Sequence, residues 1–256
     1  MINPEFLNTD DKYYSDTTMF TVSKYKKFNK CENDGLYGDN TANTVPILIG
    51  SYVDRYVEGT LETWLLEHPE LFLKTGNNKG QLKSEYRIAE DICHYIDENK
   101  ILSQFLSGDK QVVMTGEISG IPWKIKIDSY SPHIAINDLK VVREIRDNKG
   151  KYIDFIRPWG YDIQMSVYQE IVRQNTDELL PVFICACSKT NPIDSVIINI
   201  PQDVLDNTLN YVKMTAPDYW EVYQGKREPI KCGVCPTCIK SNHETPIISL
   251  EDIGEW

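Results

Sequence analysis

One segment, residues 121–142, limits the local fold more than any other part of the chain. Between residues 121 and 128, apolar side chains at 123, 125 and 127 alternate with charged ones at 124, 126 and 128. A period of two is that of a strand with one buried face. The polar residues 129–132 predict a turn, and a second strand is expected over 133–142. The segment therefore predicts an antiparallel hairpin.

Three charged residues of this hairpin can meet at one end of a sheet. Asp138 and Lys140 have the same parity on the second strand and point to the same side. Asp128 closes the first strand. Two neighbouring carboxylates suit a hard divalent cation such as Mg²⁺ or Mn²⁺, and a lysine beside them can act on a water that attacks phosphorus. The alternative is a surface hairpin whose charges are merely solvated.

The remaining pattern predicts an α/β fold with a central mixed β-sheet. The sheet consists of an antiparallel meander plus two further strands, flanked by helices. Expected strands are 111–118, 121–128, 133–142, 182–188 and 195–200, and expected helices include 47–66, 84–106, 161–174 and 202–224. The polar segment 143–160 predicts a loop over the site. No repeat or linker is evident, so we expect a single domain over 1–256.

Composition restricts the classes of function. The chain has 256 residues and a net charge of −11, which argues against a broad basic surface for DNA. No apolar run is long enough to cross a membrane, and the polar first residues do not form a signal peptide, so a cytoplasmic location without a membrane partner is expected. Seven cysteines in such a chain favour metal binding over a disulfide framework.

The cysteines divide into two groups. Cys93, Cys185 and Cys187 lie in predicted apolar helix or strand segments and are expected to be inert. Cys232, Cys235 and Cys238 place three thiols within seven residues, interrupted by glycine and proline, which is typical of metal ligands. A cysteine cluster is therefore expected at 231–243.

The order of these motifs resembles the PD-(D/E)XK nuclease superfamily. The relevant residues, in chain order, are Gly50 and Asp54, Glu117, Asp128, Asp138-x-Lys140, Gln164-x-x-x-Tyr168, and the late cysteines. Within the superfamily the order is similar to the branch of the RecB nuclease domain and the RecE-type phage and prophage recombination exonucleases. The resemblance spans about residues 20–240 and implies a restriction-endonuclease-like core.

The resemblance implies a role for each residue of the hairpin. Asp128, Asp138 and the backbone carbonyl of Leu139 are expected to bind Mg²⁺ or Mn²⁺. Lys140 is expected to act on the attacking water and to help neutralise charge on the phosphate. Glu117 is expected either to bind a second metal or a metal-bound water, or to be a carboxylate on the rim.

Two helical positions complete the expected active site. Gln164 and Tyr168 lie one turn apart, where they either approach the phosphate and order Lys140 or lie on a half-exposed helix. Asp54 follows Gly50 by four residues, where related nucleases place a histidine ligand. Asp54 is therefore expected to bind the metal, to support a ligand, or to lie in solvent, with Glu58 as the alternative ligand.

The fourth ligand of the cysteine cluster has two candidates. Related nucleases hold an iron–sulfur cluster with one early cysteine and three late ones, which favours Cys31 together with Cys232, Cys235 and Cys238. The alternative is a zinc knuckle in which His243 takes the place of Cys31.

Together, these features predict a Mg²⁺-dependent exonuclease that hydrolyses linear double-stranded DNA. The resemblance implies a role in phage-type homologous recombination beside a single-strand annealing protein. The sequence is also compatible with a homo-oligomer. One alternative is a non-catalytic nucleic-acid-binding protein with zinc or an iron–sulfur cluster on a degenerate nuclease scaffold. The other is an unrelated enzyme or structural protein.

Overall fold

A five-stranded mixed sheet is the centre of the computed structural model, which describes residues 10–38, 44–242, 245, 247, 249 and 251. The strand order is β1-β2-β3-β4-β5, with β3 and β4 parallel and the other neighbours antiparallel. The strands are β1 (Asp109–Ile118), β2 (Ile121–Ser131), β3 (Ala135–Val142), β4 (Val182–Ser188) and β5 (Ser195–Asn199). The predicted α/β class, the meander and the two further strands are confirmed.

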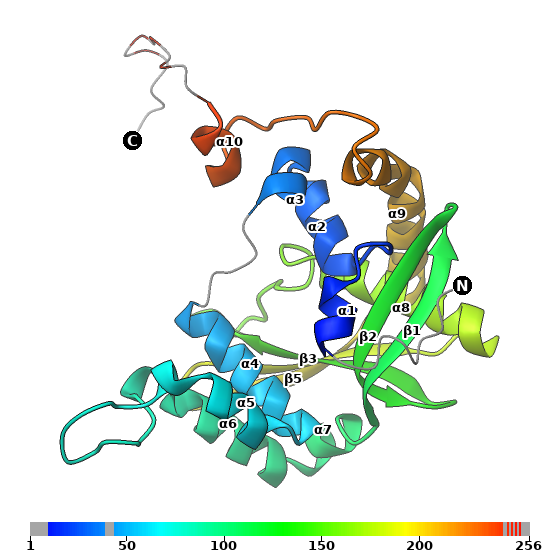
Figure 1. Cartoon of the computed structure of the whole chain (residues 1–256). Helices are drawn as coiled ribbons and strands as arrows, with labels where there is room; N and C mark the ends of the chain where they lie inside the picture. Colours follow the sequence, from blue (N-terminus) through cyan, green and yellow to red (C-terminus); the bar gives the residue numbers. More distant parts are fainter. Residues whose placement is uncertain are drawn as a thin grey trace.

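Helices cover both faces of this sheet (Figure 1). One apolar core joins the sheet to α2 (Val22–Lys30), α8 (Tyr161–Thr176) and α9 (Gln202–Tyr223). A second core lies on the opposite face, under α4 (Val45–Glu58), α6 (Arg87–Glu98) and α7 (Lys100–Phe105). The shorter helices are α1 (Asp10–Ser15), α3 (Glu32–Tyr37), α5 (Leu61–Glu67) and α10 (Pro236–Lys240), with 3₁₀ turns at Pro69–Leu71 and Ser84–Tyr86.

Two predicted helices are each divided in the structure. The helix expected over 47–66 ends at Glu58, because Gly59 adopts a left-handed conformation with φ of 77° and closes α4 before α5 begins. The helix expected over 84–106 breaks at Asn99, whose side chain caps α7 by accepting the N–H of Leu102. The first break sets the length of the helix that carries Asp54.

The hairpin turn lies later than its polar sequence predicts. β2 continues to Ser131, and the turn occupies residues 132–134, with His133 at φ of 63°. Ser129 stays in the strand because it is fully buried; its hydroxyl oxygen accepts the N–H of Gly108, and its hydroxyl donates to the carbonyl of Phe105. Buried hydrogen bonds thus override the local preference of serine for turns.

The sheet splits between β2 and β3, and this split creates the site. The two strands pair only where Ser129–Ser131 faces Ala135–Asn137. Further along β2, the segment around Phe20 takes the vacated edge: the Phe20 N–H donates to Pro122, and the Lys124 N–H donates to Phe20. The part of β2 between the Phe20 segment and the paired residues Ser129–Ser131 carries Asp128, and its edge is left open towards β3.

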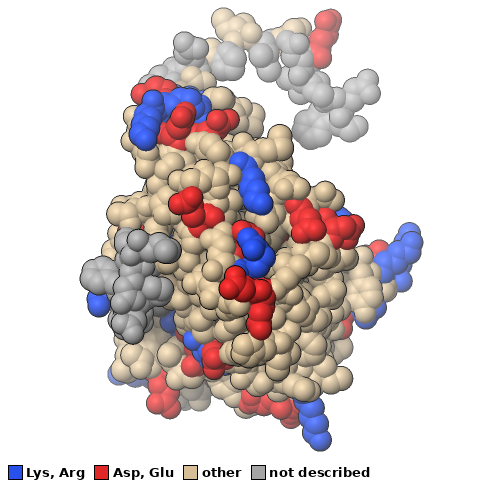
Figure 2. All heavy atoms as spheres, turned by 90° about the vertical axis from the view of Figure 1, so that its right-hand side faces the viewer, with Lys and Arg blue, Asp and Glu red and all other residues tan. Residues whose placement is uncertain are grey.

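The face of the molecule drawn in Figure 2 carries no extended basic patch. On the side turned to the viewer in Figure 2, acidic and basic side chains are interspersed among uncharged ones. This agrees with the net charge of −11. Among the described residues, no helix is both long and apolar enough to span a bilayer.

Candidate active site

Asp128 and β3 meet across the split in the sheet. Oδ2 of Asp128 accepts a hydrogen bond of 3.2 Å from the backbone N–H of Leu139. The carboxylate therefore satisfies a donor that would otherwise need a strand partner. This contact fixes Asp128 beside the segment that carries Asp138 and Lys140.

Lys140 joins the two carboxylates of the hairpin. Its ammonium forms an ion pair with Asp138 Oδ2 and lies 4.0 Å from Asp128 Oδ2. It also donates a 3.1 Å hydrogen bond to the Leu139 carbonyl, so this oxygen faces the same space. Asp138 is fully buried, whereas the side chain of Asp128 is 28% exposed. The centre is thus reached from the Asp128 side.

Asp54 reaches the same centre from α4. Burial is the largest cause that raises the pKa of the Asp54 carboxyl well above its usual range, and the negative charges of Asp128 and Asp138 raise it further, against the opposing effect of Lys140. Glu58, one turn later, accepts a 3.0 Å hydrogen bond from Arg55 instead. The structure thus brings Asp54 close to Asp128, Asp138 and Lys140, and the charge of Glu58 also raises the pKa of Asp54.

The donor set fits a hard divalent cation. Burial, followed by the charge of Asp128 among the raising effects, lifts the pKa of Asp138 to about 7 although Lys140 acts against it. Buried carboxylates that repel one another are costly unless a cation stands among them. Aspartate and carbonyl oxygens are the ligands that Mg²⁺ and Mn²⁺ prefer.

Gln164 and Tyr168 lie on the face of α8 that is turned to the hairpin. The Gln164 amide donates a 2.6 Å hydrogen bond to Oδ1 of Asp138. The Tyr168 hydroxyl donates a 2.9 Å hydrogen bond to the carbonyl of Lys126 on β2. Gln164 therefore orients a carboxylate, and Tyr168 holds the strand that carries Asp128. Neither lies on an open helix face.

Two further residues at this centre escaped the sequence analysis. Lys26, from α2, donates to the carbonyl of Trp159, and its pKa is lowered to about 8, chiefly by burial and then by the charge of Lys140. The ring of Tyr161 lies between the two ammonium groups, 5.3 Å from each. A signal for Lys26 was present in the sequence, since α2 holds four lysines and no acidic residue in nine positions.

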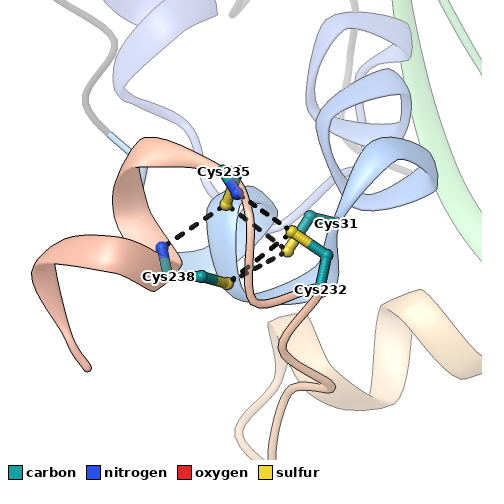
Figure 3. A group of neighbouring side chains, drawn as sticks. All are labelled: Cys31, Cys232, Cys235 and Cys238. Carbon is teal, nitrogen blue, oxygen red and sulfur yellow. Dashed lines mark hydrogen bonds between the residues drawn. The ribbon is translucent and has the colours of Figure 1, made fainter. Parts of the chain in front are cut away.

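The four cysteines Cys31, Cys232, Cys235 and Cys238 form a second centre, between α3 and α10 (Figure 3). All four sulfur atoms lie within 4.8 Å of one another. The contacts between Cys31 and Cys238 and between Cys31 and Cys235 are 3.6 and 3.8 Å. The structure thus brings the early cysteine to the three late ones. His243 lies outside the described residues.

Backbone amides donate to two of the sulfur atoms and support the thiolate form of Cys232. The Cys235 N–H donates to the sulfur of Cys232, and the Cys238 N–H donates to the sulfur of Cys235. Hydrogen bonds from the backbone of Val234 and then of Cys235 lower the pKa of Cys232 to about 6. Since thiolates, not thiols, bind metals, the arrangement fits a metal centre.

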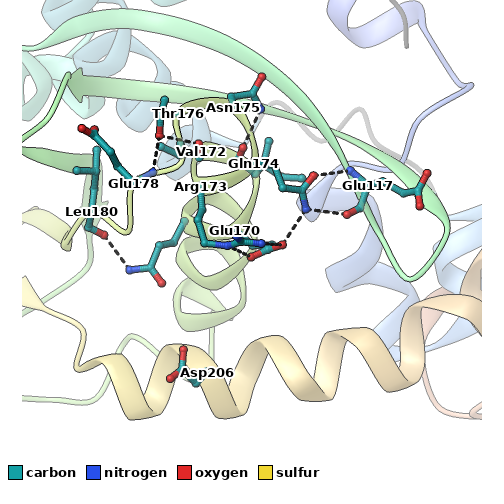
Figure 4. A network of polar contacts seen from close by, with 12 residues as sticks. Glu117, Glu170, Val172, Arg173, Gln174, Asn175, Thr176, Glu178, Leu180 and Asp206 are labelled. Carbon is teal, nitrogen blue, oxygen red and sulfur yellow. Dashed lines mark hydrogen bonds and ion pairs between the residues drawn. The ribbon is translucent and has the colours of Figure 1, made fainter.

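Glu117 is not brought to the active site, which corrects the first of its two predicted roles, the binding of a second metal or a metal-bound water. It pairs with Pro122 near the tip of the β1–β2 hairpin, while Asp128 lies level with the start of β1. Six positions separate the two levels, about 20 Å along a strand. The Gln174 side chain binds both backbone groups of Glu117, and the carboxylate points away from them (Figure 4). The sequence pattern predicts the correct strand for Glu117 but not its distance from Asp128 along the hairpin.

The comparisons with known proteins agree with this geometry. Residues 21–241 match the family model described as a PDDEXK-like domain of unknown function (DUF3799). A crystal structure of a protein from Eubacterium rectale, named there a "putative exonuclease", is 39% identical to the chain, with a TM-score of 0.86 over 95% of this chain and 97% of that one. No curated protein matches the chain. The chain therefore belongs to the PDDEXK-like family DUF3799, within the PD-(D/E)XK nuclease superfamily.

Proposed function

We propose that this protein is a metal-dependent nuclease that hydrolyses phosphodiester bonds at the centre formed by Asp128, Asp138 and Lys140. The observation that carries the proposal is the ion pair of Lys140 with buried Asp138, with Asp128 Oδ2 at 4.0 Å from the same ammonium. A solvated surface hairpin would not bury a carboxylate fully. The family and the "putative exonuclease" neighbour support the same reaction class.

A divalent cation, Mg²⁺ or Mn²⁺, would be held by Asp128, Asp138 and the Leu139 carbonyl, with Asp54 beside them. When bound, it supplies Lewis-acid activation and stabilises charge on the phosphate. Lys140 is kept as an ammonium, because the charges of Asp138 and Asp128 raise its pKa in spite of burial. We assign Lys140 the orientation of water and the stabilisation of negative charge, because its ammonium lies beside both carboxylates.

The chain's other residues hold these groups in place. Gln164 fixes the orientation of Asp138 through its 2.6 Å hydrogen bond. Tyr168 holds β2 through the carbonyl of Lys126. Because both act through other groups, they are positioning residues in the proposed reaction.

We further propose that the protein is an exonuclease that acts on linear double-stranded DNA. The name of the E. rectale protein supports the exonuclease mode. Phage-type recombination and a single-strand annealing partner rest on the resemblance in motif order alone.

The test compares linear and circular DNA. End-labelled linear duplex and closed circular duplex are incubated with the protein and Mg²⁺, Mn²⁺ or a chelator. We expect metal-dependent loss of the linear DNA only, and no loss with Asp138→Ala. Glu117→Gln, which changes a carboxylate remote from the centre, is the matched control and should retain activity. No hydrolysis by the parent with either metal, or full activity of Asp138→Ala, would overturn the proposal and favour a non-catalytic binding protein.

We propose that the four cysteines hold a single tetrahedral ion, zinc, in a structural role. Four sulfurs at about 2.3 Å from one ion lie about 3.8 Å apart. The sulfur separations of 3.6, 3.8 and 3.9 Å agree with that value. An iron–sulfur cluster places several iron and sulfide atoms among its thiolates and needs wider spacing.

Metal analysis of the purified protein decides whether the cysteines hold zinc or an iron–sulfur cluster. We expect a colourless protein with one zinc per chain that Cys31→Ser loses. Brown protein with iron and acid-labile sulfide after anaerobic purification would restore the iron–sulfur interpretation. Zinc that persists in Cys31→Ser but not in His243→Ala would instead establish the knuckle.

A further inference from the structure

The helix α2 has a basic face beside the active site. Lys24, Lys26, Lys27 and Lys30 lie on one side of the helix, and buried Val22, Tyr25 and Phe28 lie on the other. We call these four lysines the α2 lysine face. Lys24, Lys26 and Lys30 each lie over aromatic rings, and none of these three forms an ion pair with a carboxylate of the described residues. Their positive charge is therefore available to an anionic ligand.

Two cavities lie between this face and Asp128. One cavity, of about 180 Å³, is lined by Asp128, Gln164, Lys126 and Lys26. A second, of about 470 Å³, is lined by Lys24 and Lys27. The two cavities share Tyr13, Tyr14, Thr21, Ser23 and Lys124 as lining residues, so they adjoin each other, and we refer to both together as the groove.

The wall of this groove is held by a buried lysine. The Lys124 side chain is 1% exposed, and its ammonium donates to the carbonyls of Tyr13 and Asp16 and pairs with the Asp16 carboxylate. These contacts fix α1 against β2. The groove is therefore a formed feature of the fold.

Aromatic side chains stand beside the lysines. Tyr14 lines the groove and is 66% exposed. Trp159 is 58% exposed, with Lys30 over its ring and Lys26 bound to its carbonyl. Exposed rings beside basic side chains can serve as platforms on which unpaired bases stack.

We propose that the groove and the α2 lysine face form a track for one unpaired nucleic-acid strand, which leads its phosphates to Asp128 and Asp138. The track rests on the proposed nuclease function and adds the form in which the substrate reaches it. Lysines spaced along a helix follow a phosphate backbone, and exposed rings between them stack bases without reading sequence. A single strand is also the form of nucleic acid that can follow a narrow groove to a buried carboxylate. Because the chain has a net charge of −11, we expect its contacts with a polyanion to be concentrated at these lysines.

Binding is measured by fluorescence anisotropy with a labelled oligothymidylate and with a blunt hairpin duplex of the same length, with Ca²⁺ in place of Mg²⁺. We expect the parent to bind the single strand more tightly. Lys24→Ala/Lys27→Ala should weaken that binding and reduce the slope of log K against log salt by about 1.4, since each phosphate contact to a single strand contributes about 0.7. Trp159→Ala should lose about 5- to 100-fold in affinity without a change in slope.

The control variant is Lys79→Ala/Lys100→Ala, which removes the same charge from exposed positions on the other side of the sheet. It should bind like the parent. Unchanged affinity and slope for Lys24→Ala/Lys27→Ala, or loss of duplex binding alone, would overturn the track.

A small chromogenic phosphodiester separates this inference from the proposed function. Its hydrolysis needs only the catalytic centre, so Lys24→Ala/Lys27→Ala should cleave it as the parent does. If the parent cleaves it but the lysine variants bind strands normally, the track alone is wrong. If the parent does not cleave it with Mg²⁺ or Mn²⁺, the nuclease proposal falls, and the binding data judge the track separately.

Discussion

Gln164 donates a 2.6 Å hydrogen bond from its side-chain amide to Oδ1 of Asp138, and the carboxylate that it holds is fully buried. The other oxygen of Asp138 faces Lys140. One carboxylate is thus fixed from two sides, by a helix and by its own strand. This arrangement gives α8 a defined part in the site.

Gln164→Ala should lower turnover by about 10- to 100-fold, the usual effect of removing a group that orients a metal ligand. Metal affinity should change little, because the amide is not a ligand. Gln164→Glu should be worse, since it adds a carboxylate to a centre that already repels negative charge. Steady-state rates over a Mg²⁺ titration check both. Equal kinetics for parent and Gln164→Ala would remove Gln164 from the site.

Lys140→Ala should reduce turnover by about 10²- to 10³-fold, as expected for loss of one electrostatic group in the transition state. Lys140→Arg should recover part of the rate, because it keeps the positive charge between Asp138 and Asp128. Lys110→Ala is the control; it removes another lysine near Asp128, whose pKa is lowered chiefly by burial against the opposing charge of Asp128. A Lys140→Ala enzyme as fast as the parent would exclude the assigned role.

The metal-free protein should become less stable as pH rises from about 5 to about 7.5. Burial raises the pKa of Asp138 to about 7, so the folded chain holds that proton more tightly than the unfolded chain. Unfolding then releases the proton, and the free energy of unfolding falls as pH rises towards the folded pKa. Mg²⁺ should raise the melting temperature more at pH 7.5 than at pH 5. Thermal melts of the parent and Asp138→Asn at both pH values check this; the variant should lose part of the difference, because the raised pKa of Asp54 contributes with the same sign.

Cys31→Ser should destabilise the protein by a few kcal/mol, because a metal centre shared by Cys31 and Cys232 closes a loop of about 200 residues. Strong chelators should have the same effect on the parent. Cys93→Ala, which removes a buried thiol remote from the cluster, should keep its metal. Urea denaturation with metal analysis compares the three proteins. A Cys31→Ser variant as stable as the metal-loaded parent would show that the cysteine cluster does not stabilise the fold.

The hairpin was predictable because its signals are local. Strict alternation fixes which face each side chain of β2 takes, and the parity of Asp138 and Lys140 follows from strand geometry alone. The exact turn was not predictable, because Ser129 is held in β2 by partners from residues 105 and 108. Propensity cannot include such partners.

Glu117 and Lys26 mark the limits of motif order. Glu117 falls in the expected order, yet β1 carries it to the far tip of the hairpin. Lys26 belongs to no expected motif, yet α2 packs where the charges of Lys140 and Asp138 shift the pKa of its ammonium. Order along the chain says nothing of distance across the sheet.

By itself, the sequence determined the strands, their apolar faces, the Asp-x-Lys pair and the thiol-rich end, because each depends on spacing within a few residues. Only the tertiary structure decided that β2 parts from β3 beside Asp128, that α4 adds Asp54, and that α2 lies along the entrance to the site. It also brought the Cys31 sulfur to within 3.6 Å of that of Cys238, 207 positions away. These contacts join segments remote in sequence, and they form because burying the two apolar cores on either side of the sheet leaves the helices no other place to pack.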